Sequence, residues 1–179
     1  VQTCALPILL AKDALITGIG KFPKNERILD GLMQLYTSEE GVGDPADLVT
    51  LIDSAIADNP ENVDLWFGRG RIFYALKNYD ESIASFKKVV ELKPDLFEGN
   101  YYLGVFYTIK ADEMNKVMNE KQYSSQTAYD TDLKEVNAVY MDAVPWFEKA
   151  YELKKDDVNT LDFLKSICFR LRDERSEER

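Results

Sequence analysis

The sequence contains no histidine and only two cysteines, Cys4 and Cys168, among its 179 residues. Without histidine the chain lacks the most common general base and the most common metal ligand of proteins. The two cysteines form neither a disulfide framework nor the spacing of a zinc site. We therefore expect no metal site and no cofactor. Cys168 lies on an apolar stripe, so we expect it to be a buried structural residue.

Long apolar runs and positive charge are also scarce. No apolar run approaches the roughly 20 residues that span a bilayer. The 22 lysines and arginines are outnumbered by 32 acidic residues, which gives a net charge of −10. Neutralising nucleic-acid phosphates requires clustered basic side chains, so we expect no nucleic-acid partner. Hydrophobic residues make up 45% of the chain, which is enough to build a substantial core.

The remaining candidates for chemistry are three acidic pairs and one glycine pair. Neighbouring carboxylates on a helix point in different directions, whereas a general acid and base must face each other across a pocket. The glycine pair, Gly41-Val-Gly43, lacks the Lys-Ser/Thr of a phosphate loop. We predict that the chain is not an enzyme and that the pairs are solvated faces or helix caps. The acidic pairs are Asp112/Glu113, Asp130/Asp132 and Asp156/Asp157.

The stretch from residue 61 to residue 94 predicts two helices joined by a short polar break, Lys77-Asn78. Asn62 is placed to cap the first helix, and Pro94 ends the second. A glycine inside a helix costs about 1 kcal/mol against alanine, so Gly70 indicates a closely packed neighbour, which we expect near Ser82. The apolar positions at helical spacing are Leu65, Trp66, Phe73 and Leu76, then Ile83, Phe86, Val89, Val90 and Leu92.

This stretch resembles the tetratricopeptide repeat, whose pattern is W-x2-L-G-x2-Y…A-x3-F…P. Arg69 replaces the leucine of the pattern and Ser82 the alanine. Three prolines recur near the 34-residue period of the family. The resemblance implies an all-α, right-handed α-solenoid of helix-turn-helix units with about three and a half repeats. The matching residues are Trp66, Gly70, Phe73, Phe86 and Pro94, and the recurring prolines are Pro23, Pro60 and Pro94.

We interpret residues 1–179 as a single repeat domain. The parts are a partial repeat (1–23), a repeat (24–60), the best-matching repeat (61–94), a repeat with a 27-residue insertion (95–155), and a capping helix with a charged tail (156–179). An alternative for the beginning is the tail of a signal peptide with Ala5–Ala11 as its apolar core. Residues 1–7 are not interpreted as native structure under either reading.

The repeat at 95–155 carries Gly104 at the position of Gly70, while Asn100 stands where Trp66 stood. Its insertion has apolar residues at helical spacing on both sides of the polar stretch Tyr123–Thr131, so we predict an elongated antiparallel helical hairpin. Pro145 lies inside the second long helix and predicts a kink near Tyr140–Val144. We expect Asn159–Arg172 to form the last helix and Asp173–Arg179 to fray.

In the family, the first helices of the repeats line a concave groove that holds a peptide or a partner helix. The resemblance therefore implies a groove along the first helices of two repeats. A structural alternative is that Phe67 and Tyr101 are core residues and that Arg71 pairs with Asp64 or Glu98. The lysine and asparagine that clamp chaperone tails are missing from these positions. The implied groove residues are Asp64, Phe67, Arg71 and Tyr74, then Glu98, Tyr101 and Val105.

We predict a non-catalytic scaffold that binds a peptide or a partner protein in this groove. One alternative is self-assembly through the hairpin or the solenoid ends, as a structural component of a cell-envelope complex. Another is an accessory array of a larger enzyme. The extended repeat, which closes with Phe147–Lys154, also resembles a group of bacterial repeat proteins often exported to the cell envelope, which implies a periplasmic or envelope location.

Overall fold

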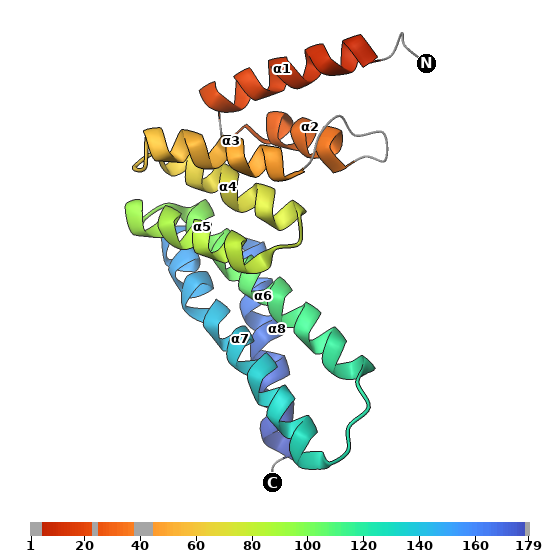
Figure 1. The fold of residues 1–179 in the computed structure, drawn as a ribbon. Helices are drawn as coiled ribbons and strands as arrows, with labels where there is room; N and C mark the ends of the chain where they lie inside the picture. The colour runs from red at the N-terminus through yellow and green to blue at the C-terminus, as the bar shows by residue number, and fades with distance from the viewer. Residues whose placement is uncertain (1–4, 23–24, 38–44, 178–179) are drawn as a thin grey trace. The chain divides into compact units, whose positions relative to one another are not determined.

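The computed structural model describes residues 5–22, 25–37 and 45–177. Within these ranges the chain forms eight helices and no strand, as predicted (Figure 1). The predicted loop over Thr37–Asp44 lies almost entirely outside them. The helices are α1 (Ala5–Lys21), α2 (Glu26–Thr37), α3 (Pro45–Asp58), α4 (Val63–Ala75), α5 (Tyr79–Leu92), α6 (Phe97–Glu120), α7 (Gln126–Leu153) and α8 (Val158–Glu177).

The chain divides into two compact units, residues 1–92 with α1–α5 and residues 93–179 with α6–α8. Each unit has its own hydrophobic core. The prediction of one domain over the whole chain stays a prediction. In the first unit, consecutive helices pack against each other, and α2 also contacts α4. The fully or nearly buried core residues there include Leu32, Leu48, Ile52, Leu65 and Ile72.

The α4–α5 hairpin begins and turns as the sequence predicts. The Asn62 side chain accepts hydrogen bonds from the backbone N–H groups of Asp64 (3.0 Å) and Leu65 (3.4 Å). These bonds satisfy two of the unpaired donors at the start of α4. At the other end Lys77 adopts a positive φ of 58°, and its N–H donates to the Tyr74 carbonyl. The left-handed residue after the helix reverses the chain, so the predicted break at Lys77-Asn78 is confirmed.

Gly70 allows α4 and α5 to approach closely. A Cβ at this position would overlap the ring of Phe86, which is completely buried. Ser82 is also buried, and its hydroxyl donates a hydrogen bond of 2.8 Å to the Gly70 carbonyl. The expectation that Ser82 meets the helix at Gly70 is therefore confirmed. Gly104 has the same role in the second unit, where a Cβ would lie 2.9 Å from the Phe147 ring.

One side chain in each unit bonds back to the carbonyl of a preceding proline. The Trp66 indole N–H donates to the Pro60 carbonyl at 2.7 Å. The Asn100 amide donates to the Pro94 carbonyl at 2.8 Å and to the Leu96 carbonyl at 2.9 Å. In both cases the donor lies six residues after the proline. Asn100 thus makes the same contact as Trp66, with a carboxamide N–H in place of an indole N–H.

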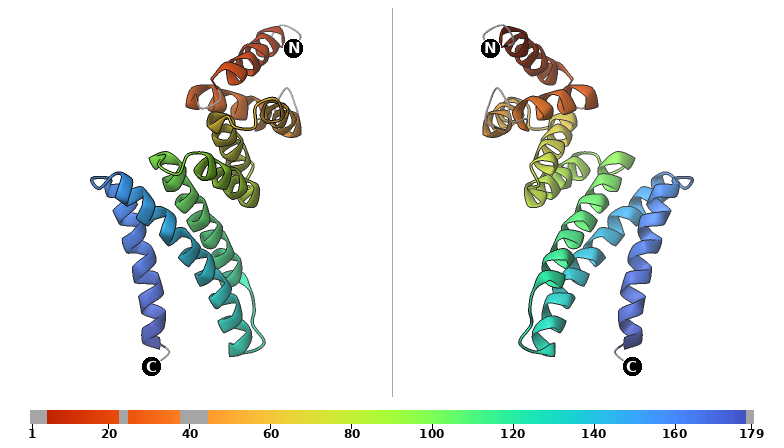
Figure 2. Two further views of the ribbon diagram at one scale, coloured as in Figure 1. Left: turned by 90° about the vertical axis from the view of Figure 1, so that its left-hand side faces the viewer. Right: turned by 90° about the vertical axis from the view of Figure 1, so that its right-hand side faces the viewer.

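The second unit contains the predicted elongated hairpin. Helices α6 and α7 have 24 and 28 residues, against 13 and 14 in α4 and α5. Figure 2 shows α6 and α7 running side by side to the connection between them, and α8 packing against α7. The side chains buried between these helices include Ala111, Met118, Val136, Tyr140 and Phe147.

The connection in this hairpin is shorter than predicted. We expected a polar connection over Tyr123–Thr131, whereas α7 begins at Gln126. The Ser125 hydroxyl accepts a hydrogen bond from the Ala128 N–H at 3.2 Å and caps the helix. A good cap lets a polar segment remain helical. The same helix is continuous through Pro145, and the kink near Tyr140–Val144 stays a prediction.

The prediction of a buried Cys168 is wrong, because this side chain is exposed. Its neighbour Ile167 is 2% exposed and belongs to the core shared with α7. The apolar residues of α8 are distributed around the helix, so position on an apolar stripe did not identify the buried side. Helix α8 extends to Glu177, and the fraying of Asp173–Arg179 stays a prediction.

Candidate functional site

The predicted groove residues of α4 differ in their exposure. Asp64 is exposed, Arg71 is half-buried, and Tyr74 has 40% of its surface exposed. Phe67, in contrast, is only 3% exposed. Its ring meets the edge of Phe86 at a centroid distance of 4.9 Å, so it belongs to the interface between α4 and α5. The surface that α4 offers therefore consists of a carboxylate, a guanidinium and a phenol.

On α6, Glu98 is exposed, while Tyr101 and Val105 are half-buried. The Tyr101 ring stacks on Phe97 at 5.6 Å and contacts the edges of Phe147 and Phe163, both at 6.1 Å.

Burial raises the pKa of the Tyr101 phenol above its ordinary value, and the charge of Asp157 and the Tyr102 phenol raise it further. The hydroxyl therefore stays protonated at neutral pH and can donate a hydrogen bond.

The positions on helices α2 and α8 that correspond to the groove positions of α4 carry polar side chains and one phenylalanine. Arg27 and Gln34 are exposed on α2, and Asn159, Asp162, Ser166 and Phe169 are exposed on α8. Thr108, the corresponding position one turn beyond Val105, is buried, and its hydroxyl donates to the Gly104 carbonyl at 3.0 Å. The side chains of Asp30 and Thr37 lie outside the described residues.

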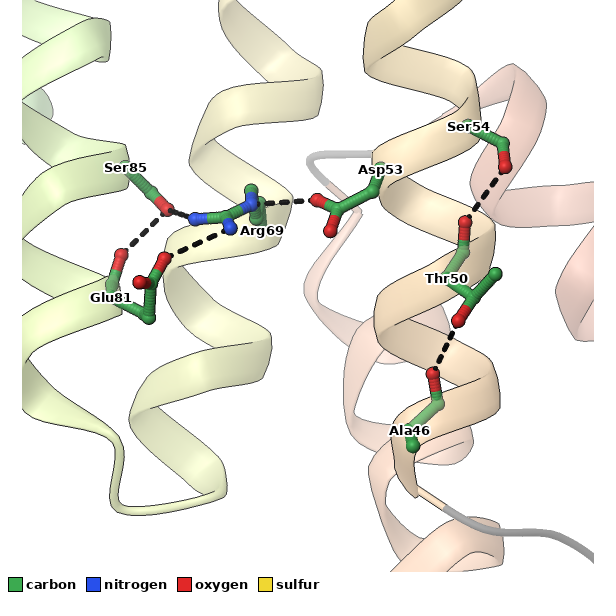
Figure 3. A network of polar contacts seen from close by, with 7 residues as sticks. All are labelled: Ala46, Thr50, Asp53, Ser54, Arg69, Glu81 and Ser85. Carbon is green, nitrogen blue, oxygen red and sulfur yellow. Dashed lines mark hydrogen bonds and ion pairs between the residues drawn. The ribbon is translucent and has the colours of Figure 1, made fainter.

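Sequence reasoning missed a polar cluster centred on Arg69. Its side chain is 15% exposed and reaches three groups (Figure 3). Nε donates to Asp53 at 2.7 Å, Nη1 to the Ser85 hydroxyl at 2.7 Å, and Nη2 to Glu81 at 2.9 Å. The guanidinium also lies 4.5 Å from the centre of the Phe73 ring. The replacement of the family leucine by arginine was the signal that pointed to it.

An open groove of about 500 Å³ lies over this cluster, between α3, α4 and α5. Arg69 forms part of its floor, and its two carboxylate partners stand on opposite walls, 46% exposed each. The cation and the two anions hold three helices together, which is a structural role. The lining residues are Asp53, Ile56, Ala57, Trp66, Arg69, Glu81, Ala84 and Lys88.

A second polar cluster lies at the end of the long hairpin. Asp132 accepts hydrogen bonds from the Lys121 ammonium (2.6 Å) and from the Tyr123 hydroxyl (2.7 Å). These hydrogen bonds, that of Lys121 first, lower the pKa of the Asp132 carboxyl below its ordinary value. Burial and the bond to Asp132 raise the pKa of Tyr123 to about 12. The cluster holds the first turns of α7 against the segment that connects α6 and α7.

Among the described residues, no group of three or more acidic, cysteine or histidine side chains could hold a metal ion. No described helix is long and apolar enough to cross a membrane.

These paired helices with glycines at their contacts define an α-solenoid of helix-turn-helix repeats. A family profile described as tetratricopeptide repeat matches residues 37–96. A crystal structure of a candidate protein-binding protein from Bacteroides ovatus aligns over 93% of this chain and 98% of its own, with 13% identity and a TM-score of 0.55. Residues 37–96 thus match the tetratricopeptide repeat, and the chain shares the fold of the Bacteroides ovatus protein.

Two other solved structures align less closely. A tetratricopeptide repeat protein from Parabacteroides merdae shares 15% identity over 92% of this chain and 67% of its own, with a TM-score of 0.40. The structure of MamA shares 15% identity over 92% of this chain and 88% of its own, with a TM-score of 0.37. The curated proteins searched include no match to the chain.

Repeats of this kind present extended surfaces for binding other proteins. The repeat matched over residues 37–96 supports a protein-interaction scaffold in the general sense, and repeats of this kind are typically non-catalytic.

Proposed function

We propose that the chain acts without catalysis and binds a peptide or a partner protein at two surfaces, the outward face of α4 in the first unit and the outward face of α6 in the second. The surface on α4 consists of Asp64, Arg71 and Tyr74, and that on α6 consists of Glu98, Tyr101 and Val105. Phe67 supports the first surface from beneath, because it is buried against Phe86.

The observation that carries the proposal is the exposure of Tyr74. A tyrosine with 40% of its surface exposed offers a large, rigid contact area at a low cost in conformational entropy. Tyrosine and arginine are also the residues most enriched among those that dominate binding energy. Arg71 lies on the same face of α4, three residues before Tyr74, so the two side chains are neighbours on the helix.

Chemical crosslinking tests the proposal. A photoreactive phenylalanine analogue at position 74 should capture a protein from a lysate of the source cells, and capture should fall at least tenfold with Arg71→Ala. The matched control places the analogue at Lys88, an exposed position on α5. Equal capture at positions 74 and 88, or capture unaffected by Arg71→Ala, would refute the proposal for α4.

The surface on α6 is tested separately with Glu98→Lys. This exposed side chain contributes little to folding, so circular dichroism should be unchanged. Binding of a partner captured with the same photoreactive analogue at position 101 should weaken. Binding at wild-type strength would remove α6 from the proposed surface.

A further inference from the structure

Helix α8 has a packed side and an exposed side. Thr160 and Ile167 are buried and Phe163 is half-buried on the side that faces α7. On the opposite side, Val158 is 65% exposed and Phe169 is 54% exposed. Leu161, at 41%, lies beside them. An apolar surface of this kind on one helix indicates an interaction site when its pattern fits a partner.

The middle of the exposed side is a single line of four residues, Val158, Asp162, Lys165 and Phe169, all exposed. The intervals are four, three and four residues, which is the alternation of core positions in a coiled coil. The line is apolar at both ends and carries one acid and one base in the middle. When a second copy of the line is placed beside it in the reverse direction, each apolar residue lies opposite an apolar residue, and the acid lies opposite the base.

We propose that α8 pairs with α8 of a second copy of the chain, antiparallel and about a two-fold axis. Val158 then lies opposite Phe169 of the second copy, and Asp162 lies opposite Lys165 of the second copy. A two-fold axis produces each contact twice. The self-complementary charge pattern is the observation that selects a second copy as the occupant of this surface.

The flanks of the line agree with the same arrangement. One flank carries Leu161 and Cys168, and the other carries Asn159 and Ser166, all exposed. In the antiparallel pair, Leu161 lies next to Cys168 of the second copy, and Asn159 lies next to Ser166 of the second copy. The apolar flanks thus meet each other, and so do the polar flanks.

Two other arrangements fit the exposed side less well. Parallel pairing would place Asp162 beside Asp162 of the second copy and Lys165 beside Lys165, which is repulsive. A helix packed as α5 packs on α4 would need a small residue at the contact. Lys165 occupies the position on α8 that Gly70 and Gly104 occupy on α4 and α6, and its ammonium lies 6.0 Å from the centre of the Phe169 ring.

Sedimentation equilibrium of the full chain tests the proposal. The line covers about three helical turns, so the interface is small and the association should be weak and concentration-dependent. The chain should be monomeric at low micromolar concentration and approach the dimer mass toward millimolar concentration. A single monomer mass over the whole range would overturn the proposal.

Charge reversal identifies the interface. Asp162→Lys alone and Lys165→Asp alone should each weaken dimerisation at least tenfold, because each places like charges opposite each other. The double variant restores both pairs with the charges exchanged, so dimerisation should return to within about threefold of wild type. Both sites are exposed, so helicity serves as a control for folding. Dimers that tolerate the single reversals, or that the double variant does not restore, would overturn the arrangement.

Cysteine trapping tests the orientation. In a Cys4→Ser background, Leu161→Cys should form a covalent dimer with Cys168 of the second copy under mild oxidation. The matched control is Ser166→Cys, which introduces a thiol on the polar flank. Equal crosslinking in the two variants would contradict the antiparallel pairing. The α4 surface of the proposed function contains none of these residues, so failure of one proposal leaves the other standing.

Discussion

Two helical glycines have opposite surroundings, and this difference decides what a methyl group would do at each. A Cβ at Gly70 would overlap the buried Phe86 ring, whereas a Cβ at Gly20 would meet nothing within 4 Å. We predict that Gly70→Ala lowers the free energy of unfolding by about 1–3 kcal/mol through overpacking. Gly20→Ala should raise it by up to about 1 kcal/mol through helix propensity. Urea unfolding measures both, and changes of the same sign would contradict this account.

The Tyr123–Asp132 pair predicts a dependence on pH. The folded pKa of Asp132 is below its ordinary value of 3.8, so its contribution to stability is present above about pH 4 and is lost as the pH falls further. The pKa of Tyr123 is raised from 10.0 to about 12, so its contribution is complete below pH 10 and is lost between pH 10 and 12.

We therefore expect the Tyr123 Cζ signal in NMR to titrate near pH 12 in the native chain. Asp132→Asn should lower this midpoint, because it removes the negative charge and weakens the hydrogen bond that favours the neutral phenol. Tyr123 titrating at an ordinary value in the native chain would show that the cluster does not form in solution.

At the scale of the elements, Arg69 joins α4 to α3 and α5. We predict that Arg69→Ala destabilises the chain by about 2 kcal/mol, since it leaves Asp53 and Glu81 without the cation and opens a space above Phe73. Arg69→Leu, the residue of the family pattern, should cost less than Arg69→Ala, because an apolar side chain of similar size can replace a paired charge. Thermal unfolding followed by circular dichroism compares them. A leucine variant less stable than the alanine variant would show that the charge itself is required.

The helices were largely predictable because each one has a local signal. Helix ends are marked by residues that cap or interrupt the backbone hydrogen bonds, here Asn62, Pro45 and Pro94. The contact between two helices is marked by Gly70. The start of α7 was misplaced because a serine cap outweighs a polar composition. The misassignment of Cys168 has another cause: α8 carries apolar residues on two sides, and only tertiary packing decides which side is buried.

The candidate site was less predictable than the fold. Family register placed Asp64, Arg71 and Tyr74 on one face of α4, but it also included Phe67, which is buried. Whether an aromatic side chain is buried depends on which side of its helix the next helix covers. The spacing of apolar residues along the sequence cannot distinguish these two sides. The Arg69 cluster joins side chains 12 and 16 residues apart, so its geometry follows only from the packed helices.

At the scale of the molecule, the second unit contains a complete core of its own. We predict that residues 93–179 fold without the first unit, because α6 and α7 bury Phe147 and Tyr140 between themselves and α8. The isolated segment should show strong helical circular dichroism and a cooperative thermal transition. A non-cooperative melt, or a spectrum of a disordered chain, would show that this core needs the rest of the protein.

Trp66 and Asn100 have a consequence for how such arrays diverge. Both donate to a proline carbonyl six residues earlier, one with an indole and the other with a carboxamide. Two chemically different side chains therefore make the same contact with a proline carbonyl, one in each unit. A repeat can thus lose its most characteristic residue and keep its helical hairpin, so a family profile that scores residue identity can end before the helical hairpins do.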